Sequence, residues 1–313
     1  MKFKVGIALL AIYLIWGSTY FAIRVSVADI PPFLMAGTRF LIAGSILLLG
    51  RCMAGDPLPH INQWKSAAVV GLLLILGGNG LVSWAEQIVP SGIAALMIGS
   101  APLFMVLVEA ALPGGTRLDF RIIFGILIGF AGIVILIRPF QLSGISSHLN
   151  LWGVISLLFA SFFWSVGSVY GKSANMPQSP LMATGMEMFV GGIALYLVGS
   201  LTGEWKLVHL GLISSSSWLG LIYLILVGSL VGFVAYSWLL RNAPVSLVST
   251  YAYVNPVIAI LLGAWLGKEE LNFNTLIAAL VIIVAVIFIS ILNRSRIKPA
   301  MESISPSTNY PGD

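Results

Sequence analysis

Polar side chains that are able to bind a solute stand inside apolar stretches of this sequence. The stretch LIWGSTYFAIR, residues 14–24, interrupts an apolar run with several hydrogen-bonding groups. On a helix, Tyr13, Trp16, Gly17, Tyr20 and Arg24 fall on one stripe, because their spacing follows the helical repeat. Polar groups in hydrocarbon need a partner or a water-filled cavity. We therefore interpret the stripe as cavity lining, with Trp16 and Tyr20 as substrate-binding candidates.

Two other interpretations of this stripe stay open. Trp and Tyr often mark the headgroup belt of a membrane protein, although Trp16 lies about eleven residues, or roughly 16 Å, into its apolar run. Small residues beside it also allow two helices to pack closely, with no role in binding.

Two prolines interrupt apolar runs near their middle. Pro102 and Pro256 each free a backbone carbonyl if they lie inside a helix, and we expect helix breaks there. Such paired interruptions point to a transport site. Asn255 directly precedes Pro256 and is a candidate for holding a substrate amide or carboxylate, as is the nearby Tyr253 hydroxyl. The alternative, a kink that serves packing alone, stays open.

Two more binding candidates come from other apolar runs. Asn79 lies within GGNG, residues 77–80, where three glycines allow close backbone approach or local unwinding. Tyr236 lies three residues past Phe233, and Phe233 is the position that corresponds to Asn79 in the repeat described below.

Charged residues inside the apolar runs are few, which makes them functional candidates. Arg39 and Glu187 are candidates for coupling or gating. A direct ion pair is not expected, because each lies roughly 10 Å deep from opposite faces; each should meet polar groups of its own half or extend outward. Glu187 is a proton-coupling candidate, with a structural or gating role as the alternative. Glu86 and Glu109 are expected at the membrane interface.

The apolar runs contain no group of residues that is typical of a catalytic site. All four Asp and all three His residues lie outside the apolar runs, which excludes an intramembrane aspartyl, Ser–His or zinc protease. There is no G-x-x-x-x-G-K-[ST] phosphate loop, and the single Cys52 has no partner for a disulfide or a zinc site. We expect no enzyme, metal or cofactor.

The composition places these residues in a lipid bilayer. Of 313 residues, 58% are hydrophobic and 9% are charged, with a mean hydropathy of +1.01. Soluble domains carry about 25% charged residues. Segments of about 20 apolar residues cross a membrane as helices, and ten qualify, at roughly 5–24, 33–51, 66–85, 90–111, 121–138, 150–171, 181–202, 217–240, 245–266 and 273–292.

The distribution of cations predicts the orientation. Eleven of the sixteen Lys and Arg residues fall on the side shared by both termini, four on the other, and Arg39 inside a span. By the positive-inside rule both termini are cytoplasmic. The N-terminal segment is read as a retained span and not as a cleaved leader. The expected location is the inner (plasma) membrane. Net charge of +5 is not read as a nucleic-acid signal.

The sequence repeats itself. A shift of 148 residues aligns Trp16 with Trp164, while a shift of 154 aligns Gly78 with Gly232 and Pro102 with Pro256. Trp164 therefore joins the substrate-binding candidates. Each half holds five spans, and since five is odd the halves are inverted, as in secondary transporters. We expect repeats at 1–140 and 148–293, and a disordered cytoplasmic tail at 294–313.

Several motifs resemble the EamA-like family of the drug/metabolite transporter superfamily. They are the WG of the first span, the small-residue second span, PSGIAAL in the fourth span, and PVSLVSTYAYVNP in the ninth. The resemblance covers about residues 5–292, as two repeats. It implies an all-α integral membrane protein, with ten helices around a central cavity, that exports small metabolites such as amino acids. The motifs define the fold rather than the solute.

These observations predict a secondary transporter of small amphipathic solutes, amino-acid-like or drug-like, working by alternating access with a proton as a candidate coupling ion. The aromatic stripe favours solutes with flat or cationic groups. The alternative is a passive channel or facilitator on the same scaffold. The expected partners are a small-molecule substrate and the lipid bilayer, with no nucleic acid, and the chain is expected to act as a monomer or homodimer.

Overall fold

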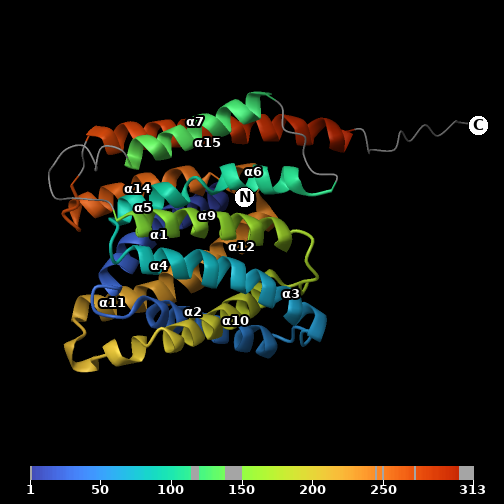
Figure 1. Cartoon of the computed structure of the whole chain (residues 1–313). Helices are drawn as coiled ribbons and strands as arrows, with labels where there is room; N and C mark the ends of the chain where they lie inside the picture. Colours follow the sequence, from blue (N-terminus) through green and yellow to red (C-terminus); the bar gives the residue numbers. More distant parts are fainter. Residues whose placement is uncertain are drawn as a thin grey trace, which may run out of the picture.

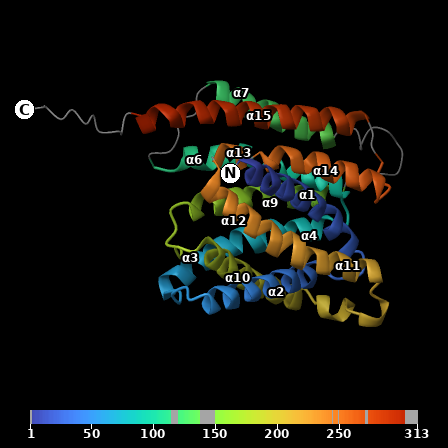
Figure 2. The same ribbon diagram turned by 180° about the vertical axis from the view of Figure 1, so that it is seen from behind.

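The chain folds into a bundle of helices that run roughly along one common direction (Figure 1). The computed structural model describes residues 2–113, 120–137, 150–243, 245–248, 250–270 and 273–302. Among these residues there are helices and turns and no strand. α15 ends at the right-hand end of the bundle in Figure 1, and α1 runs in the opposite direction, away from that end (Figure 1, Figure 2). We call that end the terminal end.

The first half of the chain supplies seven helices and one π-helical segment, η1. Their bounds are α1 Lys2–Ser26, α2 Pro32–Met53, α3 Ile61–Gly71, η1 Leu72–Gly80, α4 Leu81–Ala85, α5 Ser91–Ile98, α6 Ala101–Ala111 and α7 Phe120–Ile137.

The second half supplies a similar series with a second π-helical segment, η4, and two short 3₁₀ turns. Their bounds are α9 Leu151–Gly171, α10 Pro180–Leu201, η2 Glu204–Leu207, η3 Leu210–Leu212, α11 Ser215–Tyr223, η4 Leu224–Val231, α12 Gly232–Asn242, α13 Val245–Val248, α14 Tyr251–Trp265 and α15 Phe273–Glu302.

Seven helical stretches in the described part of the chain are long and apolar enough to cross a membrane. They correspond, within a few residues at each end, to the first four and the sixth to eighth predicted spans. The other three predicted spans each contain a shorter apolar helix, at Phe120–Leu136, Tyr251–Trp265 and Thr275–Phe288. The fold class is therefore an all-helical, apolar bundle of membrane-spanning type.

Helices from the two halves pack against each other throughout. α2 packs along α10, α7 along α15, α1 along α14, and α9 along η1 and α6. Glycines permit the closest of these contacts: a Cβ atom at Gly44 would lie 2.7 Å from the backbone N of Phe189, and one at Gly192 would lie 2.8 Å from the backbone N of Leu41. Small residues at such crossings let backbones approach in a membrane, where apolar side chains give little driving force.

The predicted helix break near Pro102 is present, and its carbonyls have partners. α5 ends at Ile98 and α6 begins at Ala101, with Pro102 in the first turn of α6. Ser165 of α9 donates to the Ala101 carbonyl at 2.9 Å, and Ser161 to the Met97 carbonyl at 3.3 Å. These two serines of α9 thus hold carbonyls on both sides of the break.

The expected break at Pro256 lies elsewhere. α14 continues through Pro256, and the interruption of this span comes earlier, at Thr250, between α13 and α14. Pro256 is accommodated by the neighbouring break, since a Cβ atom at Gly99 would lie 2.9 Å from the Pro256 ring. The break between α5 and α6 of the first half therefore packs against Pro256 within α14 of the second.

The last helix is longer than expected. α15 runs to Glu302 and includes residues 294–302, which we expected to be part of a disordered tail. Arg and Lys, which are frequent in this stretch, have high helix propensity and extend a helix that has already formed. Residues 303–313 lie outside the described part of the chain.

Candidate functional site

A cluster of aromatic rings surrounds Trp16 in the middle of α1. The ring centroids of Tyr251, Tyr236 and Phe233 lie 4.9, 5.1 and 5.3 Å from that of Trp16. The indole Nε1 of Trp16 also donates to the Gly228 carbonyl of η4 at 3.3 Å. We call these four residues the aromatic cluster. It combines α1 of the first half with α12 and α14 of the second.

The sequence anticipated part of this cluster. Trp16 and Tyr236 were predicted and come together. Tyr251 was not among the predicted binding residues, and Phe233 entered only as the position that corresponds to Asn79. The signal for Tyr251 lies in its place: it opens α14 immediately after the interruption at Thr250.

The second tryptophan occupies an equivalent place on the other half. A Cβ atom at Gly232 would lie 2.5 Å from Trp16 Nε1, and one at Gly78 would lie 3.1 Å from Trp164 Cε3. Each tryptophan thus packs against a glycine of the opposite half. Gly78 lies within η1, and Gly232 directly follows η4. Mid-helix π segments often mark functional positions.

The whole predicted stripe of α1 faces the interior. Tyr13 shares a hydrogen bond with Thr250, and Arg24 donates to the backbone carbonyl of Glu86. Gly17 lies against α14, because a Cβ atom there would be 3.3 Å from the Asn255 carbonyl. Tyr20 is half-buried and packs against the main apolar core. The lipid-belt interpretation of Trp16 therefore does not describe its surroundings.

Two of the predicted amide groups have different surroundings. The Nδ2 of Asn79 donates to the Leu74 carbonyl at 3.1 Å, within the widened turn of η1. Asn255 is 6% exposed, and its Oδ1 has no hydrogen-bond partner in the described part of the chain. A buried acceptor without a donor costs about 1–3 kcal/mol, so Asn255 is the amide that is free to bind a solute. Tyr253 is half-buried and packs against the main core.

Arg39 is fully enclosed and bridges the two halves. Its Nε donates to Ser229 of η4 at 2.9 Å, and its guanidinium lies 4.6 Å from the Phe40 ring centroid. It also interacts electrostatically with Glu86 and Tyr20. We expected polar partners from its own half. Ser229 instead belongs to η4 of the other half, and Arg39 reaches it because η4 packs directly against α2.

Glu187 and Arg39 have different electrostatic neighbours. The electrostatic neighbour of Glu187 is Tyr236 of the aromatic cluster. The two charged candidates therefore interact with different tyrosines, Glu187 with Tyr236 of the cluster and Arg39 with Tyr20, which is outside it.

Glu86 differs most from expectation. It follows α4 directly and was expected at the membrane interface, yet it is 0% exposed. Neither carboxyl oxygen has a hydrogen-bond partner among the described residues. Residues of the main core directly before it and soon after it, Ala85 and Val89, are also fully buried. The burial of Glu86 depends on how distant parts of the chain pack around it, so sequence periodicity could not reveal it.

Three carboxylates bind helix N-termini of the opposite half. Glu269 accepts from the Ser91 and Gly92 backbone N–H groups at 2.8 and 3.2 Å, and so caps α5. Asp29 and Glu204 act in the same way on α11 and α2: the first accepts from Ser214 N at 3.0 Å and the second from Leu34 N at 2.9 Å. Anionic caps at helix N-termini are stabilising.

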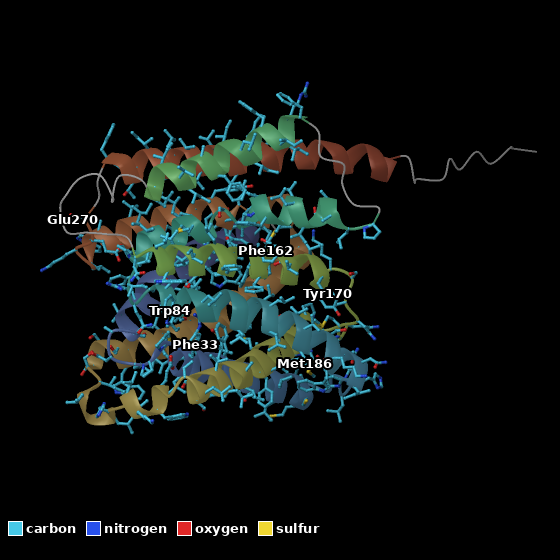
Figure 3. All side chains as sticks on the ribbon, in the orientation of Figure 1. Phe33, Trp84, Phe162, Tyr170, Met186 and Glu270 are labelled. Carbon is cyan, nitrogen blue, oxygen red and sulfur yellow. The ribbon has the colours of Figure 1, made fainter. Side chains whose placement is uncertain are left out.

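These three caps lie at one end of the bundle. The connections that carry them join α1 to α2, α10 to α11 and α14 to α15, at the left in Figure 1, opposite the terminal end. Glu270, the exposed neighbour of Glu269, is labelled there in Figure 3. We call this the capped end. Every cap joins one half of the chain to the other, so the capped end closes only when both halves meet.

The protonation of two caps differs. Hydrogen bonds from Ser214 and then Ser217 lower the pKa of Asp29 below its ordinary value. Partial burial raises the pKa of Glu204, and the N–H groups of Leu34 and Phe33 oppose that rise. The cap at Asp29 therefore persists to lower pH than an ordinary carboxylate would allow.

The fold and the site together define a class: a polytopic helical membrane protein with an enclosed aromatic and charged centre between two halves. The model of the EamA-like transporter family matches residues 4–138 and 151–291. The chain belongs to the EamA-like transporter family. The resemblance seen in the sequence is therefore confirmed, and the protein is a membrane transporter rather than an enzyme.

Several relatives carry names of the same kind. The chain is 43% identical to the uncharacterized inner membrane transporter YedA of Escherichia coli K12, over 91% of this chain and 90% of that one. It is 28% identical to Protein PecM of Dickeya dadantii, over 92% and 94%. A solved crystal structure, 22% identical, has a TM-score of 0.62 and covers 93% of this chain and 98% of that one, which supports the fold.

Proposed function

We propose that this protein is a secondary transporter with ten membrane-spanning helices, arranged as two inverted five-helix repeats around a central cavity. The repeats are residues 1–140 and 148–293. The carrier works by alternating access, exports small amphipathic metabolites across the inner membrane, and keeps both termini in the cytoplasm. It acts as a monomer or homodimer.

The observation that carries this proposal is the reciprocal placement of the two tryptophans. Trp16 of the first half lies on Gly232 of the second, and Trp164 of the second lies on Gly78 of the first. Both pairs are related by the sequence repeat, at shifts of 148 and 154 residues. Two equivalent half-sites that face each other are what an alternating-access carrier uses to exchange conformations.

The helix pairs support the same symmetry. The second spans of the two halves pair as α2 with α10, and the fifth spans as α7 with α15. The first span of each half packs along the fourth span of the other, as α1 with α14 and α9 with α5 and α6. The π-helical segments η1 and η4 fall in the third span of each half.

The groups of the site favour an amphipathic solute. Aromatic rings stack on flat groups and attract cations, and the cluster around Trp16 offers three such rings besides its own. The unpartnered Oδ1 of Asn255 accepts an amide or ammonium N–H. Arg39 supplies a positive charge for a carboxylate. An amino-acid-like or drug-like solute presents all of these groups.

Counterflow tests the carrier. A strain that overproduces the protein is first screened for tolerance to toxic amino-acid analogues and drugs. The protein is then placed in proteoliposomes loaded with an unlabelled solute from this screen, and entry of the labelled solute is measured. A carrier exchanges the two and saturates. Flux that neither saturates nor exchanges would instead establish a passive channel on the same scaffold.

Substitutions within the site test its assignment. Trp16→Ala, Trp164→Ala and Asn255→Ala should each reduce counterflow by about tenfold or more, since loss of about 1.4 kcal/mol of binding is tenfold. Trp152→Ala is the matched control, because Trp152 is 70% exposed at the start of α9. Unchanged counterflow in all three site variants would show that the solute binds elsewhere.

A further inference from the structure

Glu86 is an ionisable group that the proposed substrate site does not use. It is 0% exposed, and both carboxyl oxygens lack a hydrogen-bond donor in the described part of the chain. The other carboxylates at the capped end differ: Asp29, Glu204 and Glu269 each accept two or more hydrogen bonds. Glu86 is therefore the buried carboxyl at this end with free capacity for a ligand.

Four titratable groups around Glu86 come from three elements of the fold. Arg24 of α1 donates to the backbone carbonyl of Glu86, and Arg39 of α2 donates to Ser229. Neither guanidinium donates to the Glu86 carboxyl, although both interact with it electrostatically. Glu269, from the connection after α14, contributes a like charge, and Tyr20 of α1 is also within electrostatic range.

This environment favours the neutral carboxyl while the capped end is closed. Burying an ionised carboxylate costs several kcal/mol even after relaxation, and here no hydrogen bond offsets it. The like charge of Glu269 adds to that cost, and the two arginines offset it only in part, because their hydrogen bonds go elsewhere. A proton is also a ligand that requires no added volume in a closed site.

We propose that Glu86 is the proton-binding site that couples transport to opening of the capped end. This rests on the proposed carrier function. In the closed state the carboxyl is protonated. When the caps part, water reaches Glu86, its O–H bond breaks, and the proton passes to water on that side, leaving a carboxylate opposite Arg24 and Arg39. Closing takes the proton up again.

This assignment replaces Glu187 as the coupling group. Glu187 lies beside Tyr236 in the aromatic cluster, and its backbone carbonyl is in contact with α3, where a Cβ atom at Gly71 would lie 2.5 Å from it. It therefore belongs with the substrate site. Glu86 lies a few residues before Ser91, the residue that Glu269 caps, and it interacts electrostatically with Glu269, so we infer that parting of this cap exposes it.

Infrared spectroscopy tests whether Glu86 carries a proton. The purified full-length protein at pH 7 should show the C=O stretching band of a protonated carboxyl that shifts in D₂O. Glu86→Gln should lose that band, while Glu187→Gln, the matched control, should keep the Glu86 contribution. A spectrum in which Glu86→Gln leaves the protonated-carboxyl bands unchanged would overturn the proposal.

Thiol labelling tests the link to opening. Ile260 of α14 is buried against Gly92 of the capped helix α5, so Ile260→Cys, in a Cys52→Ser background, should react with an impermeant thiol reagent when the caps part. Its rate is divided by that of Leu210→Cys, an exposed residue at the same end, to remove the pH dependence of the thiol itself.

The expected ratio rises with external pH, by up to about tenfold per unit, because one released proton is linked to opening. Adding Glu86→Gln should hold the ratio constant, and Glu86→Asp, which restores a carboxyl, should restore the slope. A slope that persists in Glu86→Gln would overturn the proposal. Counterflow is measured separately. Exchange without an effect of Glu86 on the pH slope would support the carrier and refute the role of Glu86. An effect of Glu86 on the slope without exchange would refute the carrier.

Discussion

At the residue scale, the contact between Trp16 and Gly232 leaves no room for a larger side chain. Gly232→Ala would place a Cβ atom 2.5 Å from Trp16 Nε1, and the indole is held by Phe233, Tyr236 and Tyr251 on its other sides. Crowding of this kind costs about 1–3 kcal/mol, which exceeds the gain of up to about 1 kcal/mol from alanine's helix propensity. We expect Gly232→Ala to lower the unfolding temperature in detergent and to impair counterflow.

Gly6→Ala in α1 is the control for this prediction. A Cβ atom at Gly6 would meet nothing within 4 Å, so only the propensity gain applies, and the unfolding temperature should stay the same or rise. Gly78→Ala should have a smaller effect than Gly232→Ala, because its Cβ atom would be 3.1 Å from Trp164. If Gly232→Ala proved as stable and active as Gly6→Ala, the close contact with Trp16 would be refuted.

At the element scale, the cap on α5 joins the two halves through a single carboxylate. Glu269→Ala removes the hydrogen bonds to Ser91 and Gly92, and charge-assisted bonds of this kind contribute about 1.5–3 kcal/mol. We expect the capped end to open more often. Labelling of Ile260→Cys by an impermeant thiol reagent should therefore be faster in Glu269→Ala.

Glu270 provides a control one residue away. Glu270→Ala changes the same charge in an exposed side chain, so labelling should match that of the parent protein. Equal labelling rates for the Glu269 and Glu270 variants would mean that this cap does not hold the capped end closed.

The cap on α11 gives a pH dependence with a defined sign. The pKa of Asp29 is lowered from its ordinary 3.8 by bonds from Ser214 and Ser217, so the ionised form stabilises the folded protein above that value. The contribution is lost as pH falls through the lowered pKa. Asp29→Asn should thus unfold at a lower temperature than the parent well above pH 3.8, and the two should converge as the pH falls below 3.8 through the lowered pKa of Asp29. A constant difference across this range would contradict the assignment.

At the scale of the whole molecule, the proposed orientation is tested by topology mapping. α15 ends at the terminal end, α1 runs away from it, and the positive-inside rule assigns that end to the cytoplasm. The native Cys52 lies in the last turn of α2, at the terminal end, and is exposed. In intact cells it should resist an impermeant thiol reagent, whereas Leu210→Cys in a Cys52→Ser background should react. The reverse pattern would invert the proposed orientation.

Much of the fold could be predicted from the sequence because a bilayer requires long apolar helices. Long apolar runs predicted the spans, and Pro102 predicted the break between α5 and α6. Two predictions about where helices break or end were wrong, because several local effects compete at such positions. α14 passes through Pro256, and α15 continues to Glu302. Trp16 was identified from the polar stripe of the first span, and Tyr236 because Phe233 aligns with Asn79 in the repeat, while Tyr251 had no such signal.

The sequence by itself determined the solvent, the class of fold, the family and the polar stripe of α1, because each follows from local composition and spacing. Only the tertiary structure decided which groups meet. It joined Arg39 to Ser229, set Glu269 on the N-terminus of α5, and enclosed Glu86, which its position near a span end had placed at the membrane interface. These contacts join residues far apart in the chain, so they depend on the packing of two halves rather than on any periodicity within one.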